Sequence, residues 1–178
     1  DEVDIEKIID GMEKKRSSGF DEISNHIVKT IKTAISKPLA ILINNSLRTG
    51  EIASQLKTAK VVPLYKGGDP SDLSNYRPIS LLPVFSKIYE KVVNRQLTAY
   101  CEEHLFTDNQ FGFRQMSETQ HCVLNFLSNI AHKPRDKFKI AVFLDLKKAF
   151  DTVSHELLLK KLKFYGIRGT ALKWFTNY

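Results

Sequence analysis

The sequence predicts an α+β fold, in which helices pack on short antiparallel strands. Apolar residues recur at the three- and four-residue spacing of amphipathic helices over much of the chain. Two extended runs, residues 59–65 and 76–82, flank a long loop rich in Gly, Asp, Pro and Ser, as in an antiparallel hairpin. A third apolar run, residues 140–144, is typical of a short buried strand and ends in Asp145.

Length and composition limit the class of protein. The chain has 178 residues, enough for one domain or a piece of a larger one, and 42% of them are hydrophobic, so a core is expected and global disorder is not. A net charge of +7 indicates a polyanionic partner. No apolar run reaches the roughly 18 residues of a membrane helix and no targeting signal is visible, so we expect no membrane partner. Two cysteines are too few for a disulfide framework and fit a reducing compartment, and we expect an intracellular protein of nucleus and cytoplasm. The start at Asp1 and the stop inside an apolar, helix-like stretch indicate a fragment.

Helical spacing opens the chain. It predicts a first helix over residues 5–12 and a second helical region from Ile23. Pro38 follows a possible Ser36 cap by two residues, so we expect the helix to restart there and to run to Gly50.

The predicted hairpin carries one cation on either side of its tip. Lys66 follows the first extended run and Arg77 lies at the start of the second. An Arg and a Lys projecting from such a hairpin can hold a triphosphate, since Arg offers a two-pronged fork and Lys a compact charge. Solvated loop cations are the alternative interpretation.

A long helix is predicted next, from Val84 to about Cys101, with one apolar stripe and, on another face, Lys87, Lys91 and Arg95 at four-residue spacing. That row of cations is either a solvated face or a contact to a nucleic-acid backbone.

Residues 107–119 form a polar loop that carries two aromatic residues and an Arg around a Gly. Such side chains can stack on or support bases, while Gly lets a strand approach closely. Alternatively, the aromatic residues anchor the loop in the core. The loop contains these five residues in a row: Gln110, Phe111, Gly112, Phe113 and Arg114.

A further amphipathic helix is expected to end near His132. The spacing of Cys101, His104, His121 and Cys122 also admits a zinc site, but helical stripes explain both cysteines as core residues.

Asp145 closes the third apolar run, and Asp151 lies just beyond it. A carboxylate at the end of a short strand is a common ligand for a hard cation, although it is also a common helix cap or turn residue. A helix with a Ser154 cap is predicted to follow and to stop at Gly166, before a further helix that contains Trp174.

Four blocks, in order along almost the whole chain, resemble the reverse transcriptases of non-LTR, jockey-like retrotransposons. The blocks are KRSSGFDEISNHIVK, PLYKGGDPSDLSNYRPISLLPVFSKIYEKVV, QFGFR and FLDLKKAFDTVSHELLLKKL. The first of them has Glu22 where the family frequently has Gly.

The resemblance implies a right-hand polymerase, with a helical part of the fingers over 1–56, the rest of the fingers over 57–135, and the start of the palm over 136–178. It implies an RNA-directed DNA polymerase whose partners are an RNA template, a DNA primer or target and deoxynucleoside triphosphates. Lys66 and Arg77 would hold the triphosphate, Phe150 would lie under the sugar of the incoming nucleotide, and residues 110–114 would contact nucleic acid. Asp145 would bind two Mg²⁺ ions, with the backbone carbonyl of Leu146 as a further ligand.

The family takes further metal ligands from a later Tyr-x-Asp-Asp hairpin, and no such pair follows Asp145 in this sequence. We therefore expect these 178 residues alone to be inactive. A non-catalytic nucleic-acid-binding protein and a decayed element copy are the alternatives, and the sequence does not predict an oligomeric state.

Overall fold

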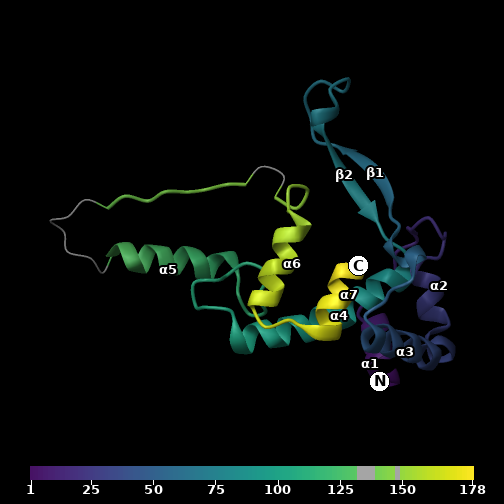
Figure 1. The fold of residues 1–178 in the computed structure, drawn as a ribbon. Helices are drawn as coiled ribbons and strands as arrows, with labels where there is room; N and C mark the ends of the chain where they lie inside the picture. Colours follow the sequence, from purple (N-terminus) through teal and green to yellow (C-terminus); the bar gives the residue numbers. More distant parts are fainter. Residues whose placement is uncertain (132–138, 147–148) are drawn as a thin grey trace. The chain divides into compact units, whose positions relative to one another are not determined.

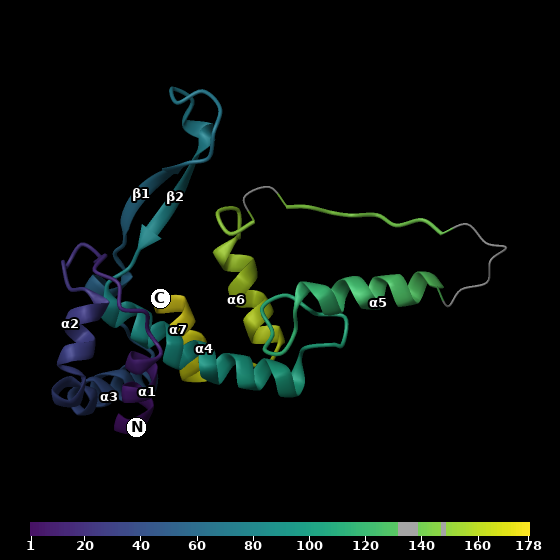
Figure 2. The ribbon, with the colours of Figure 1, turned by 180° about the vertical axis from the view of Figure 1, so that it is seen from behind.

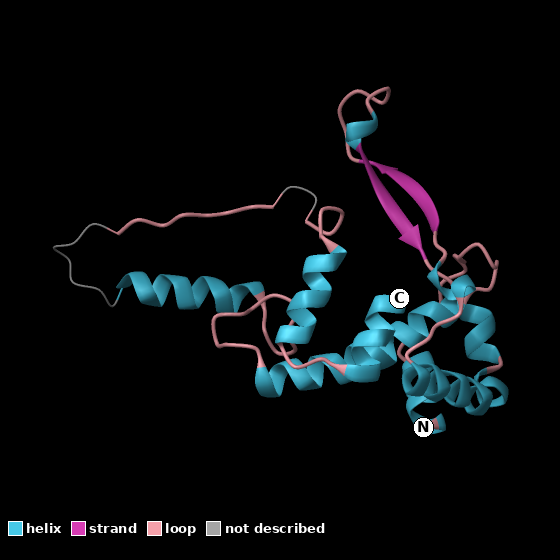
Figure 3. Cartoon of the chain, in the orientation of Figure 1, coloured by secondary structure: helices cyan, strands magenta, loops and turns pink. Residues whose placement is uncertain are grey.

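The computed structural model describes residues 1–131, 139–146 and 149–178. They contain the following helices and strands, with two short 3₁₀ turns, at Ser54–Lys57 and Leu73–Asn75 (Figures 1 and 3): α1 Glu2–Asp10, α2 Asn25–Thr30, α3 Lys32–Thr49, β1 Lys60–Tyr65, β2 Tyr76–Leu81, α4 Val84–His104, α5 Thr119–Ala131, α6 His155–Phe164 and α7 Gly169–Asn177. The mixture of helices and a short antiparallel sheet confirms the α+β class. No helix among the described residues is both long and apolar enough to cross a membrane.

The chain divides into two compact units. One consists of residues 1–95 and 159–178, and the other of residues 96–158. Because the first unit is made of two separate stretches of sequence, its packing depends on contacts between residues far apart in the chain. The division into fingers and palm remains a prediction.

Helices packed on helices form the core of the first unit. α1 and α7 both pack against α3, and the fully buried side chains include Ile9, Ile43 and Ile88, one each from α1, α3 and α4. Figure 2 shows α1, α2 and α3 together beside the beginning of α4. These apolar stripes are those that helical spacing predicted.

Pro38 lies inside α3 and does not restart a helix, so that expectation was wrong. The break comes seven residues earlier, at Ile31, which ends α2 and precedes α3. Ser36 is fully buried and its hydroxyl donates to the carbonyl of Lys32 at 2.8 Å, within the helix, instead of capping a new one. The helix ends as predicted at Gly50, which adopts a left-handed conformation with φ of 70°.

The hairpin has the predicted strands to within one residue at each outer end. β1 and β2 pair antiparallel, with Leu64 opposite Arg77 and Tyr65 opposite Tyr76. In both views the hairpin projects from the helices of its unit (Figures 1 and 2). All side chains of β1 are exposed, so the helices pack on one another rather than on these strands.

The predicted buried strand at residues 140–144 is not formed. Residues 139–146 are a loop (Figure 3), in which Ile140 is 90% and Leu144 89% exposed. A strand needs a neighbour for its backbone N–H and C=O groups, and among the described residues the only two strands, β1 and β2, pair with each other. The apolar sequence is therefore present without the sheet that would bury it.

Candidate nucleotide and nucleic-acid site

Lys66 and Arg77 lie on the same face of the hairpin. The amide of Lys66 donates to the carbonyl of Asn75 at 2.8 Å and so extends the strand ladder by one step. Leu64 opposes Arg77, and alternate residues of a strand share a face, so Lys66 and Arg77 are diagonal neighbours. Both residues are exposed, and neither has an ion-pair partner within the described ranges. Two unneutralised cations on one face suit an anionic group.

The tip between the two cations is held by its own hydrogen bonds. Asp69 accepts from the amide and hydroxyl of Ser71, and Asp72 accepts from the amide and hydroxyl of Ser74, at 2.7–2.9 Å. These donors lower the pKa values of both carboxyl groups. Asn75 donates to the carbonyl of Asp69 at 3.0 Å. The two acidic side chains near the cations are thus engaged within the tip.

The five residues at 110–114 fall into two groups. Gln110, Phe111 and Arg114 line a hollow of about 340 Å³, whereas Gly112 and Phe113 are not part of its lining. Phe113 is 91% exposed and has a φ of +62°, a backbone conformation that residues other than Gly rarely adopt. The alternative that both aromatic residues anchor the loop in the core is therefore wrong for Phe113.

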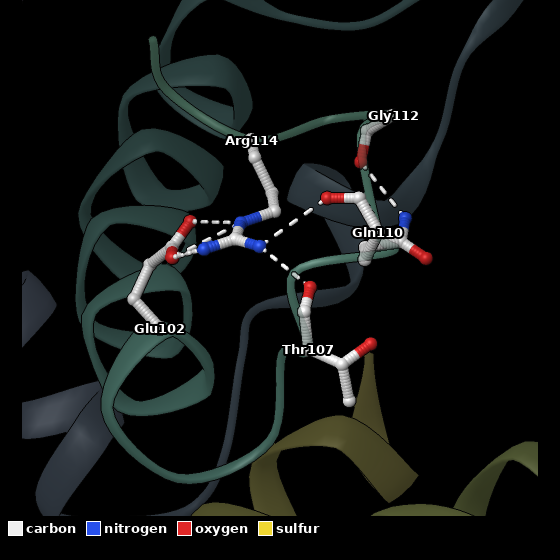
Figure 4. Close-up of polar contacts among 5 residues, drawn as sticks. All are labelled: Glu102, Thr107, Gln110, Gly112 and Arg114. Atoms are coloured by element: carbon white, nitrogen blue, oxygen red, sulfur yellow. Dashed lines mark hydrogen bonds and ion pairs between the residues drawn. The ribbon is translucent and has the colours of Figure 1, made fainter. Parts of the chain in front are cut away.

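Arg114 is engaged by the protein itself (Figure 4). Its guanidinium forms a two-pronged ion pair with Glu102 of α4, with its shortest contact, Nη2 to Oε2, at 2.7 Å. Nη1 donates to the carbonyls of Thr107 at 2.8 Å and Gln110 at 3.3 Å. Sequence reasoning did not single out Glu102, and no spacing rule pairs a helix residue with a loop residue twelve positions later.

Asp145 and Leu146 are both exposed in the loop 139–146. Phe150 is 81% exposed, and its ring packs against that of Phe113 in a T-shaped arrangement, with 6.2 Å between centroids. The structure therefore brings one predicted nucleotide contact next to one predicted nucleic-acid contact. A carboxylate and a backbone carbonyl are oxygen ligands suited to a hard cation.

No cluster of three or more His, Cys, Asp or Glu side chains placed to hold a metal occurs within residues 1–131, 139–146 and 149–178. Asp145 with the carbonyl of Leu146 can therefore supply only part of a metal site from the described residues.

The residues of the zinc alternative have other environments. His104 stacks on Tyr100 at 4.6 Å between ring centroids, and Nδ1 of His121 accepts from the amide of Glu118 at 3.2 Å. Cys101 is half-buried, which raises the pKa of its thiol, and Cys122 is exposed. The expectation that both cysteines are core residues was wrong for Cys122, because α5 has no buried residue.

Glu22 has a φ of +57° in the loop before α2. The family that the sequence resembles frequently has Gly at this position, and Gly adopts positive φ without strain. The backbone thus has the conformation that suits Gly, although the chain carries Glu.

Comparisons with known proteins identify the family of the chain. A family model described as "Reverse transcriptase (RNA-dependent DNA polymerase)" matches residues 64–178, a range that includes every candidate site residue named above. The chain is 33% identical over 181 residues to the "Probable RNA-directed DNA polymerase from transposon BS" of Drosophila melanogaster, which covers 95% of this chain and 20% of that protein. It is 32% identical over 166 residues to the "RNA-directed DNA polymerase from mobile element jockey" of the same organism, covering 90% of this chain and 18% of that protein.

The chain thus spans about a fifth of the length of these relatives. The family match covers well over half of the chain and includes both the hairpin cations and the aspartate loop. The chain therefore belongs to the reverse transcriptase (RNA-dependent DNA polymerase) family.

Proposed function

We propose that the chain is the fingers and the first part of the palm of an RNA-directed DNA polymerase of a mobile element. The observation that carries this proposal is the pair of exposed, unneutralised cations on one face of the hairpin, inside the matched range. In the complete protein, Lys66 and Arg77 would hold the triphosphate of an incoming deoxynucleotide. We infer a nuclear and cytoplasmic location, since the template and the target of a mobile element are found there.

Asp145 and the carbonyl of Leu146 are the proposed ligands of two Mg²⁺ ions, together with carboxylates from elsewhere in the complete protein. Bound ions would activate the primer 3′ hydroxyl and neutralise the leaving pyrophosphate. Phe150 would lie under the sugar and reject a ribose 2′ hydroxyl. Of the predicted nucleic-acid contacts, residues 110–114, we assign 110–113 to the RNA template and DNA primer, because Arg114 is already bonded to Glu102, Thr107 and Gln110. Phe113 offers the most exposed ring for stacking on a base.

The hairpin proposal is tested by the double substitution Lys66→Ala and Arg77→Ala in the full-length protein. Because each charged group contributes a strong hydrogen bond to a phosphate, we expect KM for deoxynucleotides to rise at least about tenfold. Lys60→Ala is the matched control, because Lys60 is an exposed cation on the same strand and face, at the far end from the tip. Equal KM values for the double variant and the control would contradict the proposal.

Asp145→Asn separates the polymerase from the alternative, a non-catalytic nucleic-acid-binding protein, which the net charge of +7 favours. In the full-length protein the polymerase proposal requires loss of primer extension with RNA binding kept. An unchanged rate of primer extension would show that Asp145 is not part of the catalytic site.

The same proposal expects no primer extension by residues 1–178 alone on a homopolymer RNA template with Mg²⁺, because the described residues provide an incomplete metal site. Measurable extension by the purified chain would show that the site is complete without further carboxylates.

A further inference from the structure

The ion pair between Glu102 and Arg114 closes the loop that follows α4. α4 ends at His104, and the amides of Leu105 and Phe106 both donate to the carbonyl of Cys101, at 2.9 and 2.8 Å. The chain then leaves the helix and returns so that Arg114 meets Glu102. Arg114 also lies over the ring of Phe106, with 5.5 Å between its guanidinium carbon and the ring centroid.

Most of the hydrogen-bonding capacity of Arg114 is used inside this loop. A guanidinium has five N–H groups. Nε and one N–H of Nη2 point to Glu102, and Nη1 donates to the carbonyls of Thr107 and Gln110. One N–H remains, so a two-pronged contact to a phosphate requires breaking at least one of these existing contacts. The partner carboxylate raises the pKa of Arg114, so the side chain stays charged.

Phe113, directly before Arg114, has an unfavourable backbone conformation. Phe113 combines a φ of +62° with 91% exposure. A bulky residue keeps such a conformation only where its surroundings impose it. The contacts of Arg114 on one side, and the hydrogen bond from Gln110 Nε2 to the Gly112 carbonyl at 2.9 Å on the other, hold the backbone on either side of Phe113.

We propose that Glu102 and Arg114 are positioning residues, which hold the loop so that the ring of Phe113 faces outward to stack on a base of single-stranded nucleic acid. The inference rests on the proposed function and deepens it. Neither member of the pair touches the nucleic acid. Glu102, on α4, thus acts on nucleic-acid binding through Arg114 and the loop.

The test uses the 178-residue chain and a fluorescein-labelled single-stranded oligouridylate RNA of about 20 nucleotides, long enough for several stacking contacts. Fluorescence anisotropy gives Kd at several salt concentrations, and hence the slope of log Kd against log salt. The variants are Glu102→Gln, Arg114→Lys, Arg114→Gln and Phe113→Ala. Glu103→Gln is the matched control, because it removes the same charge from the next residue of α4, an exposed carboxylate whose nearest basic partner is His104 at 3.7 Å.

We expect Phe113→Ala to weaken binding at least about fivefold, as for loss of one base–aromatic stack. Glu102→Gln, Arg114→Lys and Arg114→Gln should each weaken it by a similar factor without changing the salt slope, because no phosphate contact is lost. In a Phe113→Ala background, Glu102→Gln should have no further effect. A loss of affinity in Glu102→Gln is informative in itself, since removing a negative charge generally favours RNA binding, as we expect for Glu103→Gln.

Two results would overturn the inference while leaving the proposed function intact. In one, Arg114→Lys binds as the unaltered chain does, while Arg114→Gln lowers the salt slope by about 0.7, as for one lost phosphate contact on a single strand. In the other, Glu102→Gln binds as tightly as Glu103→Gln.

A second measurement reports on the order of the loop in the absence of RNA. Hydrogen exchange of the backbone amides of residues 106–116 should accelerate in Glu102→Gln and Arg114→Lys but not in Glu103→Gln. Unchanged exchange would show that the ion pair between Glu102 and Arg114 does not hold the loop. If the unaltered chain does not bind RNA, the proposed contact of this loop fails, and the positioning role fails with it. That outcome differs from the two above, in which the unaltered chain binds.

Discussion

At the scale of single residues, Trp174 links the two sequence stretches of the first unit. It is 3% exposed, and its Nε1 donates to the hydroxyl of Ser46 at 3.0 Å, which in turn donates to the carbonyl of Glu51. The ring stacks on Tyr178 with 5.1 Å between centroids. One side chain thus supplies both apolar area and a buried hydrogen bond.

We predict that Trp174→Ala lowers the free energy of unfolding by about 3–5 kcal/mol, and that Trp174→Phe lowers it by about 1–2 kcal/mol because the Ser46 hydroxyl loses its donor. Urea denaturation followed by circular dichroism measures both. Phe164→Ala is the control for loss of an aromatic ring, since Phe164 is 82% exposed, and it should change stability by less than about 0.5 kcal/mol. A similar loss in all three variants would disprove the role of Trp174.

Asp72 gives a residue-scale prediction for pH. Hydrogen bonds from Ser74 hold its pKa below the ordinary value of 3.8, because they stabilise the charged form. A carboxyl group whose pKa is lower in the folded state stabilises that state fully above about pH 3.8, and this contribution is lost as pH falls through the folded-state pKa. The backbone amide of Ser74 is the larger cause and its hydroxyl the smaller, and Ser74→Ala removes only the hydroxyl. Nuclear magnetic resonance titration of the Asp72 carboxyl carbon should therefore give a pKa that rises part of the way toward the ordinary value in Ser74→Ala. An unchanged pKa in that variant would rule out the Ser74 hydroxyl as a cause.

The candidate site could be predicted from the sequence only where local pattern decides it. The strand alternation and tip composition gave the places of Lys66 and Arg77, because hairpin register follows from neighbouring residues. The ion pair of Glu102 and the positive φ of Phe113 depend on how a loop returns to a helix, and no local pattern encodes that. The metal-binding role of Asp145 stays a prediction.

At the scale of elements, α3 carries an internal proline. Pro38 is the seventh residue of the helix, is exposed, and has no N–H for the carbonyl of Ala34. The sequence prediction placed the helix boundary at this proline. Burial of Leu39, Ala40 and Ile43 against the rest of the core outweighs the lost hydrogen bond, so the helix continues through it.

We predict that Pro38→Ala raises the free energy of unfolding by on the order of 1 kcal/mol, since the regained hydrogen bond exceeds the added freedom of the unfolded chain. Lys37→Ala is the control at the neighbouring exposed position and should be close to neutral. Urea denaturation compares the two. A destabilised Pro38→Ala would mean that the proline favours the native path of the backbone.

At the scale of the whole molecule, the second unit contains many apolar side chains that are exposed to solvent. α5 has no buried residue, and Val142 and Phe143 are 76% and 83% exposed. The sequence predicted the strand-like composition of residues 140–144. Burial, however, depends on a partner strand, and none of the described residues provides one.

We predict that the isolated chain self-associates in a concentration-dependent way through the exposed apolar side chains of residues 139–146, because exposed apolar area favours association. Val142→Lys should weaken the association measured by sedimentation velocity without altering urea unfolding of the first unit. Val61→Lys, on the hairpin at 58% exposure, is the matched control and should leave association unchanged. Equal effects of the two substitutions would show that the surface at 139–146 is not responsible.

The hydrogen bond between Trp174 and Ser46 spans 128 residues of sequence. A ribosome that adds about 5–20 residues per second needs roughly 6–26 seconds to synthesise that interval. During this time α3 has emerged but its partner α7 does not yet exist, so the face of α3 that α7 will cover stays open to other proteins. Until α7 is made, that face of α3 offers an apolar surface to which chaperones can bind, and slow codons within the interval would lengthen the exposure.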